Sequence, residues 1–348
     1  MGRLAVVLFN LGGPDSLKTV EPFLFNLFND PAIIGGARPF RWAMAKFISR
    51  RRAKVAREIY RKLGGKSPLL DETRAQAEAL QRRLTDQADP VRVFIAMRYW
   101  HPMSGDVARE VKTFQPDEIV LLPLYPQFST TTTGSSLTEW RRAALAAGLD
   151  RPTRAVCCYP KEPGFIQGQA RLIAAAMEKA EVPNRPGRPR VLFSAHGLPK
   201  KIVARGDPYQ WQVEQTAGAV VEALRMPDLD WAVCYQSRVG PLEWIGPSID
   251  DELSRAGKDG VPVIVVPIAF VSEHSETLVE LDMEYRDMAH ELNVPAYGRV
   301  PALGCQEDFI DGLGRLVETA RRRDNGIGSA AGGRPCPAGH AGCPLAAF

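Results

Sequence analysis

Strand-like apolar runs alternate with helix-like runs along most of this chain. The apolar runs are rich in β-branched and aromatic residues, and polar, helix-compatible sequence such as 104–114 lies between them. They occur at 4–10, 91–97, 118–124, 153–159, 190–195, 231–236 and 262–270. Because strands that alternate with helices pair in parallel and are covered on both faces, this pattern predicts an α/β fold built on parallel sheets.

The strand-like runs form two series, separated by a Pro- and Arg-rich stretch at 182–190 that is typical of a linker. Each series contains a strand that enters a Gly/Pro turn, LAVVLFNLGGP in the first and RVLFSAHGLP in the second. We therefore expect two similar doubly wound domains, 1–181 and 182–320, with a ligand cleft between them. Residues 321–348 lack core-forming sequence and are expected to be a flexible tail.

In parallel α/β sheets, ligands bind outside the carboxyl ends of the strands. The loops directly after the predicted strands are 10–14, 98–101, 125–135, 196–199, 236–240 and 272–276. Three of the five histidines, His101, His196 and His274, lie in these loops. Site residues are therefore expected there.

The last of these loops opens a helix-like segment with acidic residues every three or four positions. They are Glu273, Glu276, Glu280, Glu284 and Asp287, and Ser272 is a candidate N-cap. Residues so spaced share one helical face, where like charges repel and a cation would relieve the repulsion. One hypothesis is a face that handles a hard or borderline metal cation, with histidine and glutamate at its mouth.

The alternative for this segment is a solvated acidic face. A separate apolar stripe could pack the helix on a sheet and leave the acids in water. The stripe consists of Leu278, Leu281, Tyr285, Met288 and Leu292.

Composition excludes several classes of protein. A net charge of +4 on 348 residues does not imply a nucleic-acid partner. The GGKS at 64–67 lacks the earlier glycine of a phosphate-binding loop, because Tyr60 stands there, and LNLGGP lacks the third glycine of a dinucleotide fingerprint. The chain opens without a signal-peptide pattern, and its longest apolar run, Val261–Val271, has 11 residues, too few to span a bilayer. We expect a cytoplasmic enzyme.

Residues 38–57 form an amphipathic basic segment. The apolar residues Phe40, Trp42, Met44, Phe47 and Ile48 are interleaved with the basic residues Arg38, Arg41, Lys46, Arg50, Arg51 and Arg52. Such a helix could lie on an anionic membrane surface or cover an apolar, acid-bearing ligand. The alternative is a helix packed on the core with solvated charges.

The chain ends in two Cys-Pro pairs, at Cys336 and Cys343. Thiolate ligands on a tail need partners on the body of the protein, where Cys157, Cys158, Cys234 and Cys305 are available. Cys234 is the weakest candidate because it lies inside a predicted strand. Four thiolates would suit a zinc ion or an iron–sulfur cluster, whereas the alternative is a disordered tail with free thiols.

Two motifs, FSAHGLP at 193–199 and FVSEHSETLVELD at 270–282, strongly resemble ferrochelatases, the enzymes that insert ferrous iron into a porphyrin at the end of haem synthesis. Further motifs follow the family's order over about residues 3–320. These are LFNLGGP, LGGKSPL, MRYWHP, LPLYPQFSTTTTGSS, RGDPY and YQSRVGPLEWIGP. The resemblance implies two similar Rossmann-like domains with a porphyrin in the cleft between them.

The resemblance also implies roles for individual residues. His196 and Glu276 match the positions of metal binding and proton removal, and Arg98 and Tyr99 match polar residues that line the pocket. Leu11 falls where some members carry a methionine facing the macrocycle. Other positions that line or gate the pocket are Arg52, Tyr60, Ser67, Tyr209, Gln236, Ser237, Trp244 and Phe270.

Metallation replaces two pyrrole protons with one cation, so the reaction needs a base near the ring centre. We assign His196 as the proton acceptor, with Glu276, Glu280 and Glu284 carrying protons away or bringing the cation in. Alternatively, the metal could approach the porphyrin from the side of Arg98 and Tyr99. The sequence leaves the side of iron entry open. Packing by Trp244 and Phe270 could bend the macrocycle.

Some family members carry a [2Fe–2S] cluster, in one bacterial version with a C-x6-C-x-C tail and a fourth ligand from the first half of the chain. Here Cys336 and Cys343 have that x6 spacing, but Leu345 stands in place of the third cysteine. Cys158 or Cys157 matches the internal ligand, and Cys305 or His340 could complete the set. We predict a cluster on Cys158, Cys305, Cys336 and Cys343.

The predicted reaction is therefore ferrous iron plus protoporphyrin IX giving protohaem and two protons. One alternative is coproporphyrin metallation by the same chemistry, and another is a porphyrin or haem carrier without turnover. A carrier would need the cleft but not the acidic row. Peripheral contact with the inner face of a membrane fits the basic segment 38–57.

Overall fold

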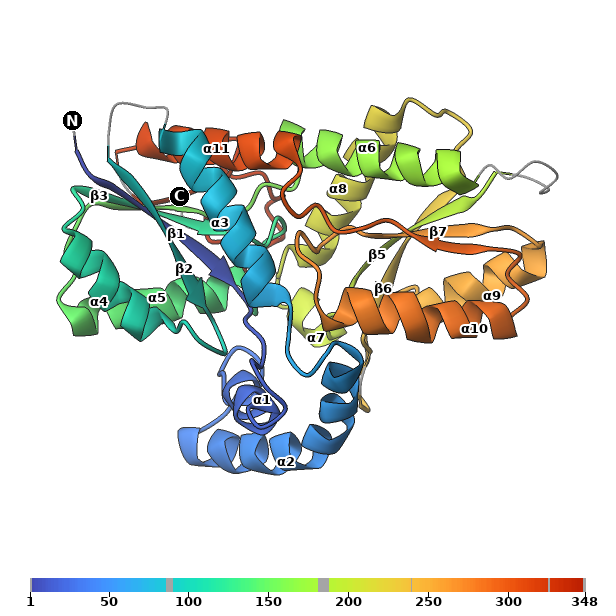
Figure 1. Cartoon of the computed structure of the whole chain (residues 1–348), viewed down its shortest axis with the longest axis horizontal. Helices are drawn as coiled ribbons and strands as arrows, with labels where there is room; N and C mark the ends of the chain where they lie inside the picture. Colours follow the sequence, from blue (N-terminus) through green and yellow to red (C-terminus); the bar gives the residue numbers. More distant parts are fainter. Residues whose placement is uncertain (1, 86–89, 181–187, 239, 325, 347–348) are drawn as a thin grey trace. The chain divides into compact units, whose positions relative to one another are not determined.

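The computed structural model describes residues 2–85, 90–180, 188–238, 240–324 and 326–346. It divides into two compact units, Met1–Cys158 with Leu313–Pro335, and Tyr159–Gly312 with Cys336–Ala346. Each unit is built on a parallel sheet flanked by helices (Figure 1), which confirms the predicted α/β class. The predicted cleft between the domains stays a prediction.

The first unit contains a five-stranded parallel sheet. Its order is β2 (Val91–Met97), β1 (Leu4–Asn10), β3 (Glu118–Pro123), β4 (Thr153–Val156) and β9 (Gly326–Gly328). β1 is buried along its whole length between β2 and β3. Helices α4 (Ser104–Phe114) and α5 (Thr133–Ala147) supply Val111 and Trp140 to an apolar cluster with Phe9 and Phe94, and α3 (Leu69–Thr85) packs beside β2.

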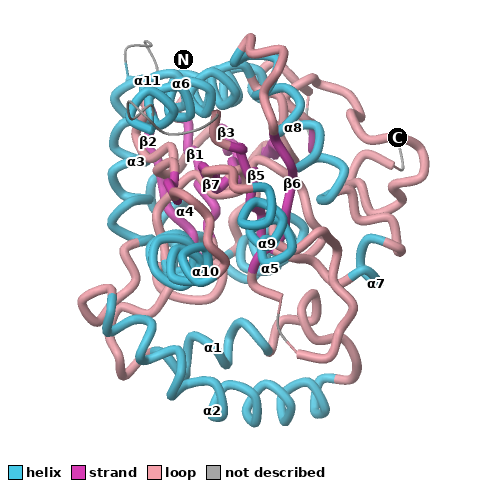
Figure 2. The backbone as a smooth tube through the Cα atoms, turned by 90° about the vertical axis from the view of Figure 1, so that its right-hand side faces the viewer, coloured by secondary structure: helices cyan, strands magenta, loops and turns pink. Residues whose placement is uncertain are grey.

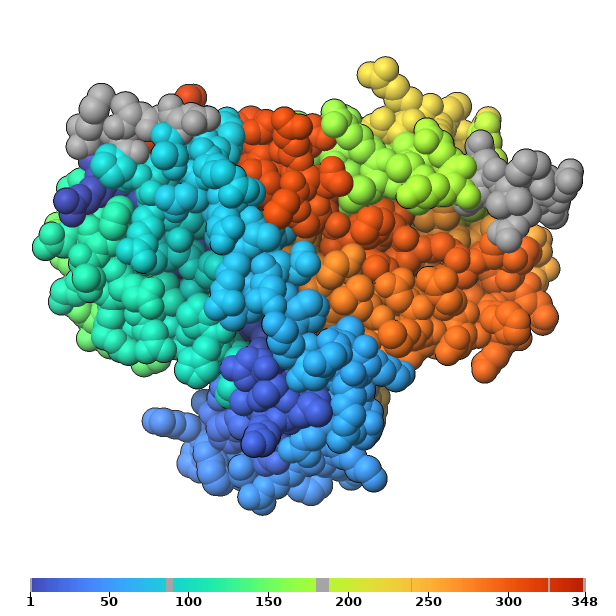
Figure 3. All heavy atoms as spheres, in the orientation of Figure 1, coloured from blue at the N-terminus to red at the C-terminus, as the bar shows by residue number. Residues whose placement is uncertain are grey.

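Helices α1 (Val20–Phe28) and α2 (Arg38–Lys62) lie side by side beyond the carboxyl end of β1, as Figures 1 and 2 show from two directions. The predicted amphipathic segment is therefore helical. Its side chains Phe40, Trp42 and Phe47 are 60%, 53% and 61% exposed, and the segment forms an outer surface in Figure 3 (medium blue). None of the helices in the described part of the chain is both long enough and apolar enough to cross a membrane.

The second unit contains a four-stranded parallel sheet. Its order is β6 (Trp231–Gln236), β5 (Arg190–His196), β7 (Val263–Pro267) and β8 (Tyr297–Arg299). The helical elements are α6 (Pro163–Ala180), α7 (Lys200–Val203), α8 (Tyr209–Leu224), α9 (Ile249–Asp259), the π-helix η1 (Glu276–Glu284), α10 (Tyr285–Glu291) and α11 (Glu307–Arg321), the last of which continues into the first unit.

The acidic segment packs on this second sheet through its apolar stripe. Leu281 and Tyr285 join a core cluster with Leu192 and Val265, and Met288 packs against it. This confirms the predicted packing of the stripe. The structure corrects the start of the helix, which is Glu276 instead of a residue next to Ser272, and its type, which is π over Glu276–Glu284.

The units cross the predicted domain boundaries. Helix α6 belongs to the second unit, although it precedes the predicted linker 182–190, most of which lies outside the described residues. Within the predicted tail, β9 pairs with β4 in the first sheet. Cys336 and Cys343 are only 5% and 4% exposed. The described part of the tail is thus packed, which differs from the expected core-free segment.

Candidate active site

Strands β1 and β5 both end in turns that require glycine. A Cβ on Gly13 would lie 2.4 Å from Ser67 Oγ, and a Cβ on Gly197 would lie 2.9 Å from the carbonyl oxygen of Gln236. The missing side chain therefore lets each turn pack tightly against a neighbouring loop of its own unit. In the second unit this close approach places the end of β5 beside the end of β6.

His196, the last residue of β5, faces Glu276, the first residue of η1. The His196 Nδ1 lies 2.8 Å from Glu276 Oε2, and the two side chains are 44% and 24% exposed. Parallel pairing of β5 with β6 and β7 brings the loops after these strands to one edge of the sheet. The strand-end rule therefore correctly brings the imidazole and the carboxylate together.

Glu280 lies behind this pair and is held by the loop after β6. Its carboxylate accepts hydrogen bonds from Gln236 Nε2 at 3.1 Å, from the Ser237 N–H at 2.9 Å and from Ser237 Oγ at 2.6 Å. Ser237 also donates to Glu276 Oε2 at 3.4 Å. Its φ of 61° is a left-handed conformation that few non-glycine residues adopt, a form of strain that clusters at functional sites.

The carboxylates and the imidazole shift one another's pKa. Burial alone would raise the pKa of Glu276, but the charge and hydrogen bond of His196 hold it well below its usual range. Burial and the charge of Glu276 raise the pKa of Glu280 to about 7. Burial would lower the pKa of His196, yet Glu276 and Glu280 raise it overall. The cluster therefore combines a firmly ionised carboxylate with groups that can exchange protons near neutral pH.

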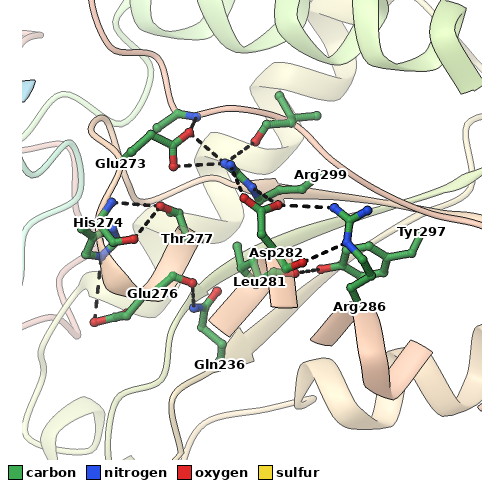
Figure 4. Close-up of polar contacts among 12 residues, drawn as sticks. Gln236, Glu273, His274, Glu276, Thr277, Leu281, Asp282, Arg286, Tyr297 and Arg299 are labelled. Carbon is green, nitrogen blue, oxygen red and sulfur yellow. Dashed lines mark hydrogen bonds and ion pairs between the residues drawn. The ribbon is translucent and has the colours of Figure 1, made fainter. Parts of the chain in front are cut away.

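His274 also lies near Glu276, as Figure 4 shows, and approaches the carboxylate oxygen that His196 does not contact. Its Nε2 lies 3.9 Å from Glu276 Oε1, its ring centroid lies 4.5 Å from that of Phe270, and the residue is 7% exposed. Burial lowers the pKa of His274. The sequence signals for this residue were its place in the loop after a predicted strand and its position beside the acidic row, and the resemblance did not assign it a role.

Three further predicted pocket residues belong to the second unit. Tyr209 begins α8 and is 8% exposed, and its pKa is raised by burial and then by the charge of Glu276. Trp244 is half-buried, with its Cε3 3.2 Å from the position of a Cβ on Gly197. With Phe270 beside His274, these aromatic side chains border the imidazole and carboxylate cluster.

In the first unit, Arg98 and Tyr99 converge on a residue that the sequence did not point to, Asp30. Its Oδ2 accepts hydrogen bonds from Arg98 Nη2 at 2.8 Å, from the Tyr99 hydroxyl at 2.7 Å and from Ser135 Oγ. Arg98 Nε also donates to Ser135 Oγ at 2.7 Å. Burial and the charge of Asp30 raise the pKa of Tyr99 well above its usual value, so its hydroxyl stays a donor.

The other predicted residues of the first unit are spread over its strand-end region. Leu11 and Tyr60 share an apolar cluster with Tyr99. Ser67 is 8% exposed, and its N–H donates to the carbonyl of Pro14 at 2.8 Å. Arg52 is exposed on α2, with its guanidinium 5.8 Å from the centre of the Phe28 ring.

The predicted cluster ligands are mostly buried thiols. Cys158 lies in the first unit, with its Sγ 3.4 Å from that of Cys157. Cys336 and Cys343 are buried in the second unit, where Gln212 Nε2 donates to Cys336 Sγ at 3.2 Å, and Cys305 is exposed. Among the described residues, no three His, Cys, Asp or Glu side chains form a group that could hold a metal ion. The predicted four-thiolate set is therefore not assembled in this structure.

Parallel α/β units with an imidazole and carboxylates at their strand ends define a class of α/β protein suited to handling metal cations and protons. The solved structures of the sirohydrochlorin chelatase SirB share this fold. The SirB of Bacillus subtilis with Fe3+ has a TM-score of 0.53 at 15% identity and covers 92% of this chain and 96% of its own. The cobalt complex from the subspecies spizizenii has a TM-score of 0.54 at 11% identity, with 93% and 97% covered.

Sequence comparison is more specific. The ferrochelatase family model matches residues 3–321. The ferrochelatase of Caulobacter vibrioides strain NA1000 is 53% identical over 98% of this chain and 97% of its own, and that of Phenylobacterium zucineum is 54% identical with the same coverage. The chain belongs to the ferrochelatase family and is a metal–porphyrin chelatase, a lyase of haem synthesis.

Proposed function

We propose that the protein inserts ferrous iron into protoporphyrin IX, releasing two protons and forming protohaem in the final step of haem synthesis. Membership of the ferrochelatase family supports metal insertion into a porphyrin. The observation that carries the proposal at residue level is the His196–Glu276 pair, with Glu280 hydrogen-bonded behind it. In this proposal the centre of the porphyrin comes within reach of His196.

His196 accepts the pyrrole protons. Ionised Glu276 can only accept hydrogen bonds, so the His196 Nδ1–H donates to it and leaves the lone pair on Nε2. That nitrogen takes the proton from a pyrrole N–H, and the charge of Glu276 stabilises the imidazolium that forms. Removal of both protons leaves the ring nitrogens as ligands for the incoming cation.

Glu280 takes the proton onward. A carboxyl whose pKa is about 7 can both accept and release a proton at neutral pH. Gln236 and Ser237 keep this carboxylate beside Glu276. Glu284 lies four residues further along the segment and is exposed, so it completes a route to solvent.

An anaerobic assay with ferrous iron and either protoporphyrin IX or coproporphyrin tests the proposal, with metallation followed by absorbance. His196→Ala should lower turnover by about 10²–10⁴-fold while porphyrin binding, followed by fluorescence quenching, persists. His101→Ala is the matched control, because His101 also lies in a strand-end loop but is 61% exposed in its side chain. Its turnover should match that of the wild type.

The same assay separates the alternatives. Faster metallation of coproporphyrin would replace protoporphyrin IX as the substrate. Wild-type protein that binds both porphyrins and metallates neither would be a carrier, and the enzymatic proposal would be wrong.

We propose that α2 contacts the surface of an anionic membrane on the cytoplasmic side. Its exposed Phe40, Trp42 and Phe47 stand among basic side chains, a combination that favours a lipid interface. Co-sedimentation with vesicles containing phosphatidylglycerol should fall when Phe40 and Phe47 are both replaced by serine. Vesicles of phosphatidylcholine alone should bind less at the same lipid concentration.

We also propose a [2Fe–2S] cluster on the thiols of Cys158, Cys305, Cys336 and Cys343. Thiolates are the ligands that such clusters use, and three of these four side chains are buried. Because the described residues do not gather them into one group, no step of the reaction is assigned to a cluster. Protein purified without oxygen should show visible charge-transfer absorbance together with bound iron and sulfide, and Cys343→Ser should lose all three. Colourless protein without sulfide would contradict the cluster.

A further inference from the structure

Arg299 forms ion pairs with two acidic residues, one before and one after Glu276 in the sequence. Its side chain is 9% exposed and lies between Glu273 and Asp282, as Figure 4 shows. Nη1 donates to both Glu273 oxygens at 2.9 and 3.2 Å. Nε and Nη2 donate to the two Asp282 oxygens at 2.8 and 2.7 Å. One guanidinium therefore connects the loop before η1 to the body of that helix.

Two neighbouring contacts act on the same parts of the chain. The Tyr297 hydroxyl, also from β8, donates to the carbonyl of Leu281 at 2.7 Å. The N–H of Ala302 donates to Glu273 Oε1 at 2.9 Å. Strand β8 therefore contacts η1 itself through Tyr297, and the loop after β8 contacts the residues before η1 through the backbone of Ala302.

A π-helix of nine residues needs such support. Its hydrogen bonds run from residue i to i+5, as in the Tyr285 N–H to the Glu280 carbonyl. π-Helical geometry is rare and usually confined to a single turn within an α-helix. A change back to α-helical winding would rotate the carboxylates of Glu276 and Glu280 relative to each other and to His196. The contacts that fix both ends therefore determine where these two carboxylates point.

We propose that Arg299 is a positioning residue, which holds Glu276 and Glu280 in their working arrangement by clamping Glu273 and Asp282. The inference rests on the proposed proton-transfer function of those two carboxylates. In the described part of the chain, the hydrogen bonds of the Arg299 side chain go to Glu273, Asp282 and the carbonyl of Val300, and to neither working carboxylate. Arg299 thus acts on the site through the helix.

The planar fork of arginine is essential to this role. Lysine is a point charge and cannot make two parallel bonds to one carboxylate while bonding a second. Arg286 provides a matched control, since its Nη2 lies 3.6 Å from Asp282 Oδ1 while its side chain is 53% exposed. It approaches the same carboxylate, and its Nε donates to the Asp282 carbonyl at 2.9 Å, without bridging to Glu273.

The experiment compares Arg299→Gln, Arg299→Lys and Arg286→Gln in the full chain. With ferrous iron and protoporphyrin IX, both Arg299 variants should lose about 10–100-fold in kcat, because a small misplacement of catalytic groups costs that much. The porphyrin KM should stay within about twofold of wild type, since the porphyrin contacts are untouched. Arg286→Gln should stay within about twofold in both parameters.

Amide hydrogen exchange in the ligand-free proteins provides a second measurement that does not depend on turnover. Exchange over residues 276–284 should accelerate in both Arg299 variants and not in Arg286→Gln. If all three variants had the exchange rates and the kcat of the wild type, the proposed role of Arg299 would be wrong. Full activity of Arg299→Lys would also overturn it, because the positive charge alone would then suffice.

These measurements separate the two proposals. If wild-type protein binds porphyrin without metallating it, the proposed function is wrong, yet exchange over 276–284 still decides whether Arg299 holds the helix. If Arg299→Gln does not fold, Arg299→Lys and its exchange pattern decide the matter.

Discussion

Asp30 in the first unit and Glu276 in the second are carboxylates with contrasting surroundings. Asp30 is 3% exposed, its Oδ2 accepts hydrogen bonds from Arg98, Tyr99 and Ser135, and its Oδ1 accepts one from the Ala32 N–H. Its charge is therefore paired and both oxygens are occupied. Glu276 keeps 24% of its side chain exposed and has a second carboxylate, Glu280, as a neighbour. The Asp30 arrangement fixes side chains in place, whereas the Glu276 cluster contains groups, His196 and Glu280, that can exchange protons near neutral pH.

The difference shows where each region contributes. A buried carboxylate with a cation and several donors is rigid, and the loss of one partner is costly. The neighbouring carboxylates of Glu276 and Glu280 repel each other, which costs stability. The same repulsion raises the pKa of Glu280 to near neutrality. The Asp30 network should therefore matter mainly for stability, and the Glu276 cluster mainly for turnover.

The largest expected effect is on turnover in the second unit. Glu276→Gln keeps the shape of the side chain but removes the charge that orients His196, so kcat should fall by about 10³-fold. The midpoint of thermal unfolding should fall modestly, because the variant loses the ion pair with His196 but also relieves the repulsion with Glu280. Assays and melting curves of this variant can be compared with Glu291→Gln, which alters an exposed residue of α10. A stable but fully active Glu276→Gln protein would contradict the assignment.

The next largest effect is on stability in the first unit. Asp30→Asn leaves the Arg98 guanidinium, whose side chain is 15% exposed, without its anionic partner. The free energy of unfolding, measured in urea, should fall by about 3–5 kcal/mol. Asp71→Asn serves as the control, because its Lys66 partner is 56% exposed, and it should cost less than about 1 kcal/mol. If Asp30→Asn is as stable as the wild type, the contrast between the two regions fails.

The sequence predicted the second region better than the first. His196 and Gln236 are the last residues of β5 and β6, and Glu276 begins the helix that follows β7. Parallel pairing brings the carboxyl ends of these strands to one edge of the sheet. Asp30 gave no signal, since it follows α1 in a loop without a motif and its partners Arg98 and Ser135 are 68 and 105 residues away. Long-range side-chain pairing of this kind leaves no periodic trace in the chain.

Other differences also have physical causes. Acidic residues four apart suit an α-helix and a π-helix alike, so the type of η1 depends on contacts such as that of Arg299 with Asp282. The strands β8 and β9 have three residues each, too few to produce a strand pattern. The tail was expected to lack a core because residues 321–348 lack core-forming sequence, yet backbone contacts such as the Gly342 N–H to the Gly206 carbonyl hold it.

A smaller effect concerns the pH dependence of stability. The pKa of Glu280 is about 7 in the fold, against 4.5 for an ordinary glutamate, so folding favours its protonated form. This contribution to stability is complete below the lower value and is lost as the pH rises through the higher one. The raised pKa of His196 adds a loss only at the upper end of this window, because an ordinary histidine titrates at 6.5.

Glu280→Gln removes the carboxyl titration. The free energy of unfolding of this variant should therefore decline less than that of the wild type between about pH 5 and about pH 7. Parallel pH curves for the two proteins, or a steeper decline in the variant, would mean that Glu280 keeps an ordinary pKa.

The smallest expected effects come from two matched tyrosines, one in each region. Tyr99→Phe removes one hydrogen bond to Asp30, and Tyr297→Phe removes one to the carbonyl of Leu281. Each should lower the free energy of unfolding by about 1 kcal/mol, the usual net contribution of one hydrogen bond. Only Tyr297→Phe should also lower kcat, because Leu281 lies in the π-helix that carries Glu276 and Glu280. Equal turnover in the two variants would show that the support of η1 and the buried Asp30 network serve the same structural purpose.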